Sequence, residues 1–414
     1  MIIIYNLLIQ LYQFALKGAS FFNPKAKQWV EGRKHIFMKI ESTVKHDKPI
    51  AWFHCASLGE FEQGRPVIEA FRERFPQFRI LLTFFSPSGY EIRKNYAGAD
   101  YIFYLPADTR RNARKFIHLV DPKVVIFVKY EYWFNYIRAL KKKGTPLIFI
   151  SAIFRPGQRF FTWWGKWQLK GLKLADHFFV QNEQSADLLK SVDIKQVTIS
   201  GDTRFDRVSQ VAQQKKSFPL VEKFKSNNRI FLAGSTWPPD EEIILALIGK
   251  KVPGLKFIFA PHEVHPERIE ALINTLPENA LKFSEADENY IGQANILIID
   301  SIGILSHLYQ YAEIAYIGGG FGVGIHNILE AATFGKPVIF GPNYQKFQEA
   351  RELLAIGGAF SISDQKGFLE FTEKLLEDED FLRKASQTSK DYVAGKTGAT
   401  RMILEYLGEE ILGR

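Results

Sequence analysis

Short apolar runs alternate with amphipathic helical patterns over most of the chain, beginning at Lys48. The runs are rich in β-branched and aromatic residues, a pattern typical of parallel strands whose two faces are both covered by helices. In the first half the predicted strands are Ile50–Cys55, Arg79–Phe85, Tyr101–Leu105, Lys123–Lys129, Pro146–Ser151, His177–Gln181 and Val197–Ser200. This alternation predicts an α/β fold of the doubly wound type.

The strand pattern stops between Thr203 and Asn228, where the sequence is polar. A second series follows, with predicted strands at Ile230–Ala233, Lys256–Ala260, Ile296–Asp300, Glu313–Ile317, Val338–Phe340 and Ala359–Ser361. The predicted segments are therefore an N-terminal helix (1–22), a first domain (23–205), a linker (206–228) and a second domain (229–414). Two doubly wound domains in tandem predict a ligand-binding cleft at the carboxyl ends of both sheets.

The N-terminal segment has the pattern of a membrane-associated helix. Its first 16 residues carry no charged side chain, and its polar residues recur on one helical stripe at Asn6, Gln10, Gln13 and Lys17. Since a span needs about 20 apolar residues, a short anchor and a helix lying in the interface both remain open. An ordinary buried helix is the alternative. The basic residues that follow predict that the rest of the chain is cytoplasmic.

Charge is distributed unevenly along the chain, whose net charge is +9. Residues 1–207 contain 33 Lys and Arg against 18 Asp and Glu, whereas the remainder contains 21 against 27. The basic half predicts attraction to an anionic partner, which can be a lipid surface, a nucleic acid or a phosphorylated substrate. The single cysteine, Cys55, excludes an intramolecular disulfide.

A glycine-rich loop, Gly318–Gly324, lies between a predicted strand and a predicted helix over Ile325–Phe334. Free N–H groups at such a helix start can bind a phosphate, and glycines let the backbone approach it. Asn327 and Glu330 share a helix face there, where they can bond a base or a ribose. A tight turn with a buried polar helix start explains the pattern equally well. The spacing matches neither the dinucleotide-binding nor the P-loop fingerprint.

Three polar residues follow predicted strands of the first half and are candidates for chemistry. Glu60 can act as a general base, although Ser57-x-x-Glu60 is also a capping box. Glu131 is flanked by aromatic residues that can desolvate it, and Arg204 can steady a phosphate or form a simple salt bridge.

Metal binding is not expected. His262 and His265 form an H-x-x-H, but no cysteine or third acidic ligand has zinc-like spacing. The acidic run at 378–380 has the pattern of a solvated helical face.

Several motifs in order resemble the family of Kdo transferases, which transfer 3-deoxy-D-manno-oct-2-ulosonic acid (Kdo) to the lipid A precursor. The motifs are HCASLGEFEQG (54–64), KYEYWFN (129–135), GDTRFD (201–206), GSTWPPDEE (234–242), HPER (265–268) and GIHNILEAATFGKPVIFGP (324–342). The likeness runs over nearly the whole chain.

The resemblance implies an inverting, metal-independent glycosyltransferase of the two-domain GT-B architecture. Its donor would be CMP-Kdo, its acceptor lipid IVA, and its location the cytoplasmic face of the inner membrane, without a cofactor or nucleic acid. Glu60 matches the family's catalytic base, and Glu131 and Arg204 match positions that stabilise the transition state. The positions matching the CMP site are Pro261, His262, Ile302, Gly303, Ile304, Asn327, Ile328, Leu329 and Glu330.

The sequence departs from the family pattern at a few positions. His262 stands where arginine is usual, Ile304 where glutamate is usual, Ile325 where a second glycine is usual and Ser151 where asparagine is usual. Arg268 or a protonated His262 is a candidate to replace the missing arginine.

Two other classes remain open. Another membrane-surface GT-B glycosyltransferase or a nucleotide-sugar epimerase could use the same glycine loop, and displacement of CMP by UDP would favour either. A non-catalytic basic protein that binds membrane or nucleic acid would explain the charge but not the loop; salt-sensitive lipid association without CMP binding would favour it.

Overall fold

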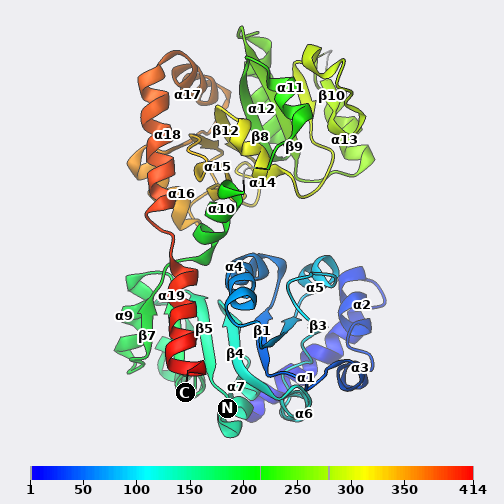
Figure 1. Cartoon of the computed structure of the whole chain (residues 1–414), viewed down its shortest axis with the longest axis vertical. Coiled ribbons are helices and arrows are strands. Elements are labelled where there is room, and N and C mark those ends of the chain that lie inside the picture. Colours follow the sequence, from blue (N-terminus) through cyan, green and yellow to red (C-terminus); the bar gives the residue numbers. More distant parts are fainter. Residues whose placement is uncertain (1, 215, 278–279, 414) are drawn as a thin grey trace. The chain divides into compact units, whose positions relative to one another are not determined.

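The computed structural model describes residues 2–214, 216–277 and 280–413. They form two compact units, one of residues 1–207 with 397–414 and one of residues 208–396 (Figure 1). Within the described residues each unit contains one seven-stranded sheet in which all neighbouring strands are parallel. This confirms the predicted α/β class with two doubly wound sheets.

The first unit has the strand order β3-β2-β1-β4-β5-β6-β7. Its strands are β1 (Ile50–Cys55), β2 (Arg79–Phe84), β3 (Tyr101–Tyr104), β4 (Pro122–Val128), β5 (Leu147–Ala152), β6 (His177–Val180) and β7 (Val197–Ile199). The order reverses between β1 and β4, so the loops after these two strands lie at the switch point where open α/β sheets bind ligands.

Helices cover both faces of this sheet because successive strand residues point to opposite sides. Trp52 of β1 lies in the core with Phe116 and Tyr136, whereas the next residue, Phe53, packs with Phe71 on the other face. The helices are α1 (Ile2–Ala19), α2 (Pro24–Glu31), α3 (Ile36–Thr43), α4 (Leu58–Arg74), α5 (Pro87–Arg93), α6 (Arg110–Val120), α7 (Phe134–Lys143), α8 (Lys166–Leu172), α9 (Glu183–Ser191) and α19 (Ala399–Tyr406).

The second unit has the strand order β10-β11-β9-β8-β12-β13-β14, with its switch point between β8 and β12. Its strands are β8 (Arg229–Thr236), β9 (Leu255–Pro261), β10 (Ala280–Lys282), β11 (Ile296–Ile298), β12 (Ile314–Ile317), β13 (Val338–Phe340) and β14 (Ala359–Ser361). Its helices are α11 (Pro219–Lys225), α12 (Pro238–Gly249), α13 (Pro266–Ile273), α14 (Leu305–Leu308), α15 (Leu329–Ala332), α16 (Gln348–Ile356), α17 (Gln365–Glu377) and α18 (Glu379–Ala394). The edge strand β10 was not predicted, since three half-buried residues give no periodic signal.

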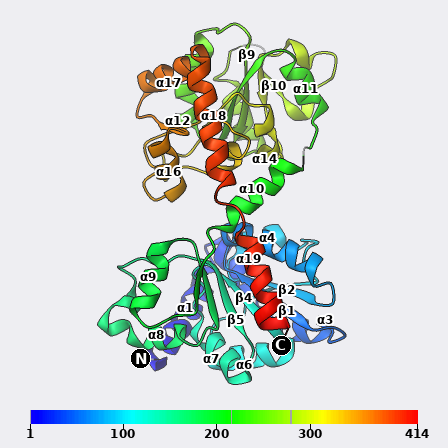
Figure 2. The same ribbon diagram turned by 60° about the vertical axis from the view of Figure 1, so that its left-hand side comes forward.

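The last helix does not belong to the second unit, as the predicted range 229–414 would place it. Figure 2 shows α19 against the first unit, where Ile403, Leu404 and Leu407 join the core that contains Phe53. Asp206 fixes the start of this segment, because its carboxylate accepts from the backbone N–H groups of Gly398 and Thr400. The sequence of this helix predicts an apolar face but does not indicate which of the two sheets that face covers. Of the predicted linker 206–228, residues 206–213 belong to α10 (Thr203–Gln213), and Lys215 lies outside the described residues.

Helix α1 contacts the first unit through the side that carries Tyr5 and Asn6. The Tyr5 hydroxyl donates to Asp108 Oδ2 at 2.5 Å and Asn135 Nδ2 donates to Asn6 Oδ1 at 2.8 Å. Its opposite side exposes large apolar residues, namely Ile3, Ile4, Leu7, Leu8, Leu11 and Phe14. Among the described residues α1 is the one helix long and apolar enough to cross a membrane, by length and composition only. The orientation does not match the alternative of an ordinary buried helix.

Candidate active site

Glu60 lies in the first turn of α4, directly after the end of β1. Its Oε2 accepts a hydrogen bond from the Ser57 backbone N–H at 3.1 Å, so the predicted capping role is present. Burial, together with the nearby charge of Glu131, raises the pKa of Glu60 to about 8. The capping contact does not exclude catalysis, because a carboxyl group with this pKa can take a proton at slightly alkaline pH.

Glu131, in the loop after β4, is buried and held by two side chains. Nε2 of His54 is 3.0 Å from Glu131 Oε2, and Trp133 Nε1 donates to the same oxygen at 2.6 Å. The other ring nitrogen of His54 is 2.8 Å from Oγ1 of Thr83, which also accepts from Trp52 Nε1. This network fixes the direction of the Glu131 carboxylate.

His54 was not predicted as a site residue. The signal that could have identified it is a polar residue inside the apolar run Ile50–Cys55, because buried polar groups require partners.

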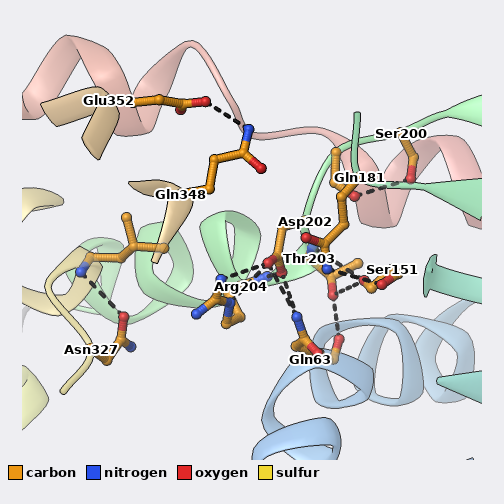
Figure 3. Close-up of polar contacts among 12 residues, drawn as sticks. Gln63, Ser151, Gln181, Ser200, Asp202, Thr203, Arg204, Asn327, Gln348 and Glu352 are labelled. Atoms are coloured by element: carbon orange, nitrogen blue, oxygen red, sulfur yellow. Dashed lines mark hydrogen bonds and ion pairs between the residues drawn. The ribbon is translucent and has the colours of Figure 1, made fainter. Parts of the chain in front are cut away.

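Arg204 is oriented by a buried carboxylate, as Figure 3 shows. Its Nε donates to Asp202 Oδ2 at 2.9 Å, and Gln63 Nε2 lies 3.1 Å from both Asp202 oxygens. Although burial by itself raises the pKa of Asp202, the charge and hydrogen bonds of Arg204 bring that pKa below its ordinary value. Ser151 stands where the family usually has asparagine. Its hydroxyl oxygen lies 2.7 Å from the hydroxyl oxygen of the adjacent Thr203, so it has a structural contact here. Asp202 and Gln63 were also not predicted.

The three predicted catalytic residues belong to one electrostatic cluster in the first unit. The charges of Glu60, Asp202 and Arg204 all act on the Tyr130 phenol, whose pKa is raised chiefly by burial. The Lys129 ammonium acts on both Glu60 and Asp202, where it favours the ionised carboxylate. Gln63, on the same helix as Glu60, bonds to Asp202 in the loop after β7, so this contact joins the helix of Glu60 to the segment that carries Arg204.

The glycine-rich loop of the second unit is built on backbone contacts. A Cβ on Gly318 would lie 2.3 Å from the Ser235 carbonyl oxygen, and one on Gly320 would lie 2.6 Å from the Gly341 Cα. Asp240, which is buried, also holds the loop by accepting from the Gly319 N–H at 2.9 Å. These contacts match the tight-turn explanation of the glycines.

The helix after this loop is shorter than predicted. It spans Leu329–Ala332, one turn instead of Ile325–Phe334, because residues 324–327 continue as an extended loop and Asn327 Oδ1 accepts from the Leu329 N–H at 3.2 Å. The predicted helix therefore begins four residues later than expected, and the phosphate site at its start stays a prediction.

The predicted nucleotide-binding residues differ in what they expose. Ile328 and Leu329 are completely buried, so only their backbone can meet a ligand, whereas Ile302 is 86% exposed. Asn327 Nδ2 donates to Glu330 Oε1 at 3.1 Å, which confirms that these two side chains share one face. Pro261 ends β9 and is buried, and Gly303 and Ile304 lie in the loop before α14.

His262 stacks on another imidazole. Its ring centroid is 4.3 Å from that of His326 and 4.8 Å from that of Trp237, so the loops after β8, β9 and β12 meet there. Arg268 is bound to Glu241 in a buried ion pair and is not the free replacement considered for the missing arginine. No group of three or more His, Cys, Asp or Glu in the described part of the chain could hold a metal ion.

Comparison with known proteins identifies the family. The sequence profile of the 3-deoxy-D-manno-octulosonic-acid transferases matches residues 31–207. A 3-deoxy-D-manno-octulosonic acid transferase of Aquifex aeolicus is 30% identical over 351 residues, which cover 83% of this chain and 89% of that protein. This chain belongs to the Kdo transferase family. A 3-deoxy-D-manno-octulosonic acid transferase of Chlamydophila psittaci is 26% identical over an alignment that covers 80% of this chain and 78% of that protein.

The fold is shared more widely than the family. A UDP-GlcNAc 2-epimerase from Neisseria meningitidis superposes with a TM-score of 0.61 at 18% identity. The superposition covers 87% of this chain and 99% of the epimerase chain. At that identity the likeness shows the fold alone. The assignment to the Kdo transferases rests on the sequence relatives and confirms the resemblance carried by the motifs.

Proposed function

We propose that this chain is an inverting glycosyltransferase that moves Kdo from CMP-Kdo to the lipid A precursor, lipid IVA, in lipopolysaccharide synthesis. The membership in the Kdo transferase family supports the reaction class. The observation that carries the mechanism is the raised pKa of Glu60. This half-buried carboxyl group follows β1, and its pKa is about 8.

In this mechanism Glu60 takes the proton of an acceptor hydroxyl. The acceptor oxygen forms a bond to the anomeric carbon of Kdo while the bond from that carbon to the CMP phosphate oxygen breaks. The electron pair leaves with CMP, and the configuration inverts because attack comes from the face opposite the phosphate. Arg204, oriented by Asp202, would stabilise the charge that develops, and Glu131 would stabilise the positive character of the sugar. No step in the proposal uses a metal ion.

The nucleotide would bind to the second unit. Of the residues proposed for this role, His262, Asn327 and Glu330 offer side-chain polar atoms, Ile302 and Ile304 offer apolar contact, and Pro261, Gly303, Ile328 and Leu329 offer mainly backbone groups. The stacked rings of His262 and His326 form a flat surface beside the glycine loop, on which an aromatic base can stack.

We also propose that the chain lies on the cytoplasmic face of the inner membrane with α1 in the plane of the interface. Since the side of α1 with Tyr5 and Asn6 is bonded to the first unit, the opposite, apolar side is the one available to lipid. Trp163 and Trp164 of the segment 160–167 are exposed and suit the same interface. Phe160, Phe161 and Trp167 of that segment instead pack against the core.

The test is a transfer assay with CMP-Kdo and lipid IVA, in which products are identified by mass. We expect Glu60→Gln to lower the rate by about 10²- to 10⁴-fold, because general-base catalysis is lost. The glutamine amide oxygen can still accept from the Ser57 N–H, so folding is preserved. Glu62→Gln, on the same helix, is the matched control. A Glu60→Gln variant with nearly full activity would remove Glu60 as the base, and CMP binding without transfer by the unsubstituted chain would redirect the proposal to another CMP-sugar.

A further inference from the structure

A groove of about 600 Å³ runs beside α1 in the first unit. Its walls come from the end of α1, from α2, α3 and the segment between them, and from α6 and the loop before it. Cationic side chains line it at Lys17, Arg33 and Lys34, and apolar ones at Trp29, Phe37 and Met38. No carboxylate belongs to the lining among the residues that the structure describes.

Arg33 places a largely buried positive charge in this groove. Its Nε donates to the Leu105 carbonyl at 2.9 Å and its Nη2 to the Phe85 carbonyl at 2.8 Å, while the guanidinium lies 3.8 Å from the Trp29 ring centroid. Burial lowers the pKa of Arg33 to about 9, so the group still carries its charge at neutral pH.

No carboxylate pairs with this guanidinium in the described part of the chain. A charge that is taken out of water without a counter-ion is costly, because carbonyl dipoles and rings replace its hydration only in part. An anion bound in the groove would supply the missing charge.

The rim of the groove has the character of a lipid surface. Lys17 and Lys34 are exposed and form no ion pair within the described ranges. Phe14, one turn before Lys17 on α1, is 78% exposed, and Met38, which lines the groove, is 66% exposed. Cations beside uncovered apolar side chains match an amphiphile that carries a negative head group.

We propose that this groove binds the phosphate head group of an anionic glycerophospholipid of the bilayer, with its acyl chains lying toward Met38 and the outer side of α1. The proposal rests on the proposed placement of α1 in the membrane interface. A free phosphate would leave the apolar lining unused, and a nucleic acid backbone would leave the neighbouring apolar side of α1 uncovered.

The experiment is sedimentation of the full chain with vesicles of phosphatidylcholine, with or without phosphatidylglycerol. The groove variant carries Lys17→Gln and Lys34→Gln. The control variant carries Lys25→Gln and Lys27→Gln, which remove the same charge from exposed sites on the neighbouring helix α2, outside the groove. A diffuse attraction to anionic lipid would weaken equally in both variants.

We expect the groove variant to lose about ten-fold more phosphatidylglycerol-dependent binding than the control variant, since it removes site contacts as well as charge. Calorimetric titration with a soluble short-chain phosphatidylglycerol should give saturable binding to the unsubstituted chain and none to the groove variant. Equal losses in the two variants would overturn the proposal. Inorganic phosphate binding as tightly as the lipid, or displacement of the short-chain lipid by the lipid A precursor, would also overturn it.

These measurements contain neither sugar donor nor transfer step, so their failure is distinct from failure of the proposed glycosyltransferase activity.

Discussion

Two carboxyl groups of the first unit, the half-buried Glu60 and the buried Asp202, show how partners decide a pKa at the scale of single residues. Glu60 and Asp202 are both desolvated, yet the pKa of Glu60 rises and that of Asp202 falls. The difference lies in their neighbours, since Glu60 faces the charge of Glu131 whereas Asp202 faces the guanidinium of Arg204. One group is suited to accept a proton and the other to remain an anion that orients a cation.

The pH dependence of transfer should report the interaction between Glu60 and Glu131. A base acts in its ionised form, so we expect the rate of the unsubstituted chain to fall as pH decreases through about 8. Glu131→Gln removes a negative charge that raises the pKa of Glu60, and it should move this limb to lower pH while reducing the maximal rate. The measurement is kcat/KM against pH. Glu62→Gln should leave the limb in place, and an unmoved limb in Glu131→Gln would show that its charge does not act on Glu60.

Asp202 should act as a positioning residue for Arg204. Asp202→Asn keeps the size of the side chain but removes its charge, and the loss of one charge-assisted contact is expected to lower kcat by about 10- to 100-fold. CMP affinity, measured by calorimetry, should not change if the nucleotide binds to the second unit. Asp187→Asn, at an exposed position of α9, is the matched control. Equal losses of kcat and CMP affinity would contradict the role of Asp202 in positioning.

At the scale of elements, the glycine-rich segment shows how a local pattern can be explained by long-range contacts. The order strand, loop, helix and strand was predicted and is present, but the helix is a single turn. The glycines are required where the loop meets the ends of neighbouring strands, since a side chain at Gly318 or Gly320 would collide with backbone. Backbone cannot yield as a flexible side chain can, so these positions accept only glycine.

Gly320→Ala should therefore destabilise the second unit. The added Cβ would lie 2.6 Å from the Gly341 Cα, and we expect the free energy of unfolding to fall by about 2 to 3 kcal/mol. Gly322→Ala is the matched control in the same loop, because its nearest neighbour, the Gly319 carbonyl oxygen, would be 3.6 Å away. Denaturant unfolding of the two variants measures the difference. A Gly320→Ala variant as stable as Gly322→Ala would show that the loop can move away from Gly341.

At the scale of the whole molecule, the excess of positive charge and the exposed apolar side of α1 both belong to the first unit. Residues 1–207 carry the excess of Lys and Arg, and α1 exposes its apolar side from this unit. The groove with Arg33 is connected to the candidate active site, since Arg33 donates to the Phe85 carbonyl and the Phe85 ring lies 4.5 Å from that of Trp133, which donates to Glu131. The proposed lipid groove and the proposed catalytic residues thus belong to one folded unit.

Association with anionic vesicles should have a salt-sensitive and a salt-resistant part. Raising salt from about 0.01 M to 1 M shortens the screening length from about 30 Å to about 3 Å, so the attraction of the basic unit should be largely lost. The remaining binding should depend on the apolar side of α1, and Leu7→Gln with Leu11→Gln should remove it. Sedimentation at both salt concentrations measures the two parts. Complete release of the unsubstituted chain at high salt would contradict a role of α1 in the interface.

The sequence alone predicts the class of fold, nearly all the strands and the family, because alternating apolar runs and ordered motifs are local properties. It also placed Glu60, Glu131 and Arg204 after strands, where a parallel sheet brings loops together. The three-dimensional structure was needed to establish the side of α1 that faces the protein, the unit on which α19 packs and the partners of Arg204. The contacts of His54 with Thr83 and Glu131, and of Asp240 with the glycine loop, could not be predicted from the sequence either. These depend on residues far apart in the chain, and the hydrophobic pattern of a segment does not specify its partner.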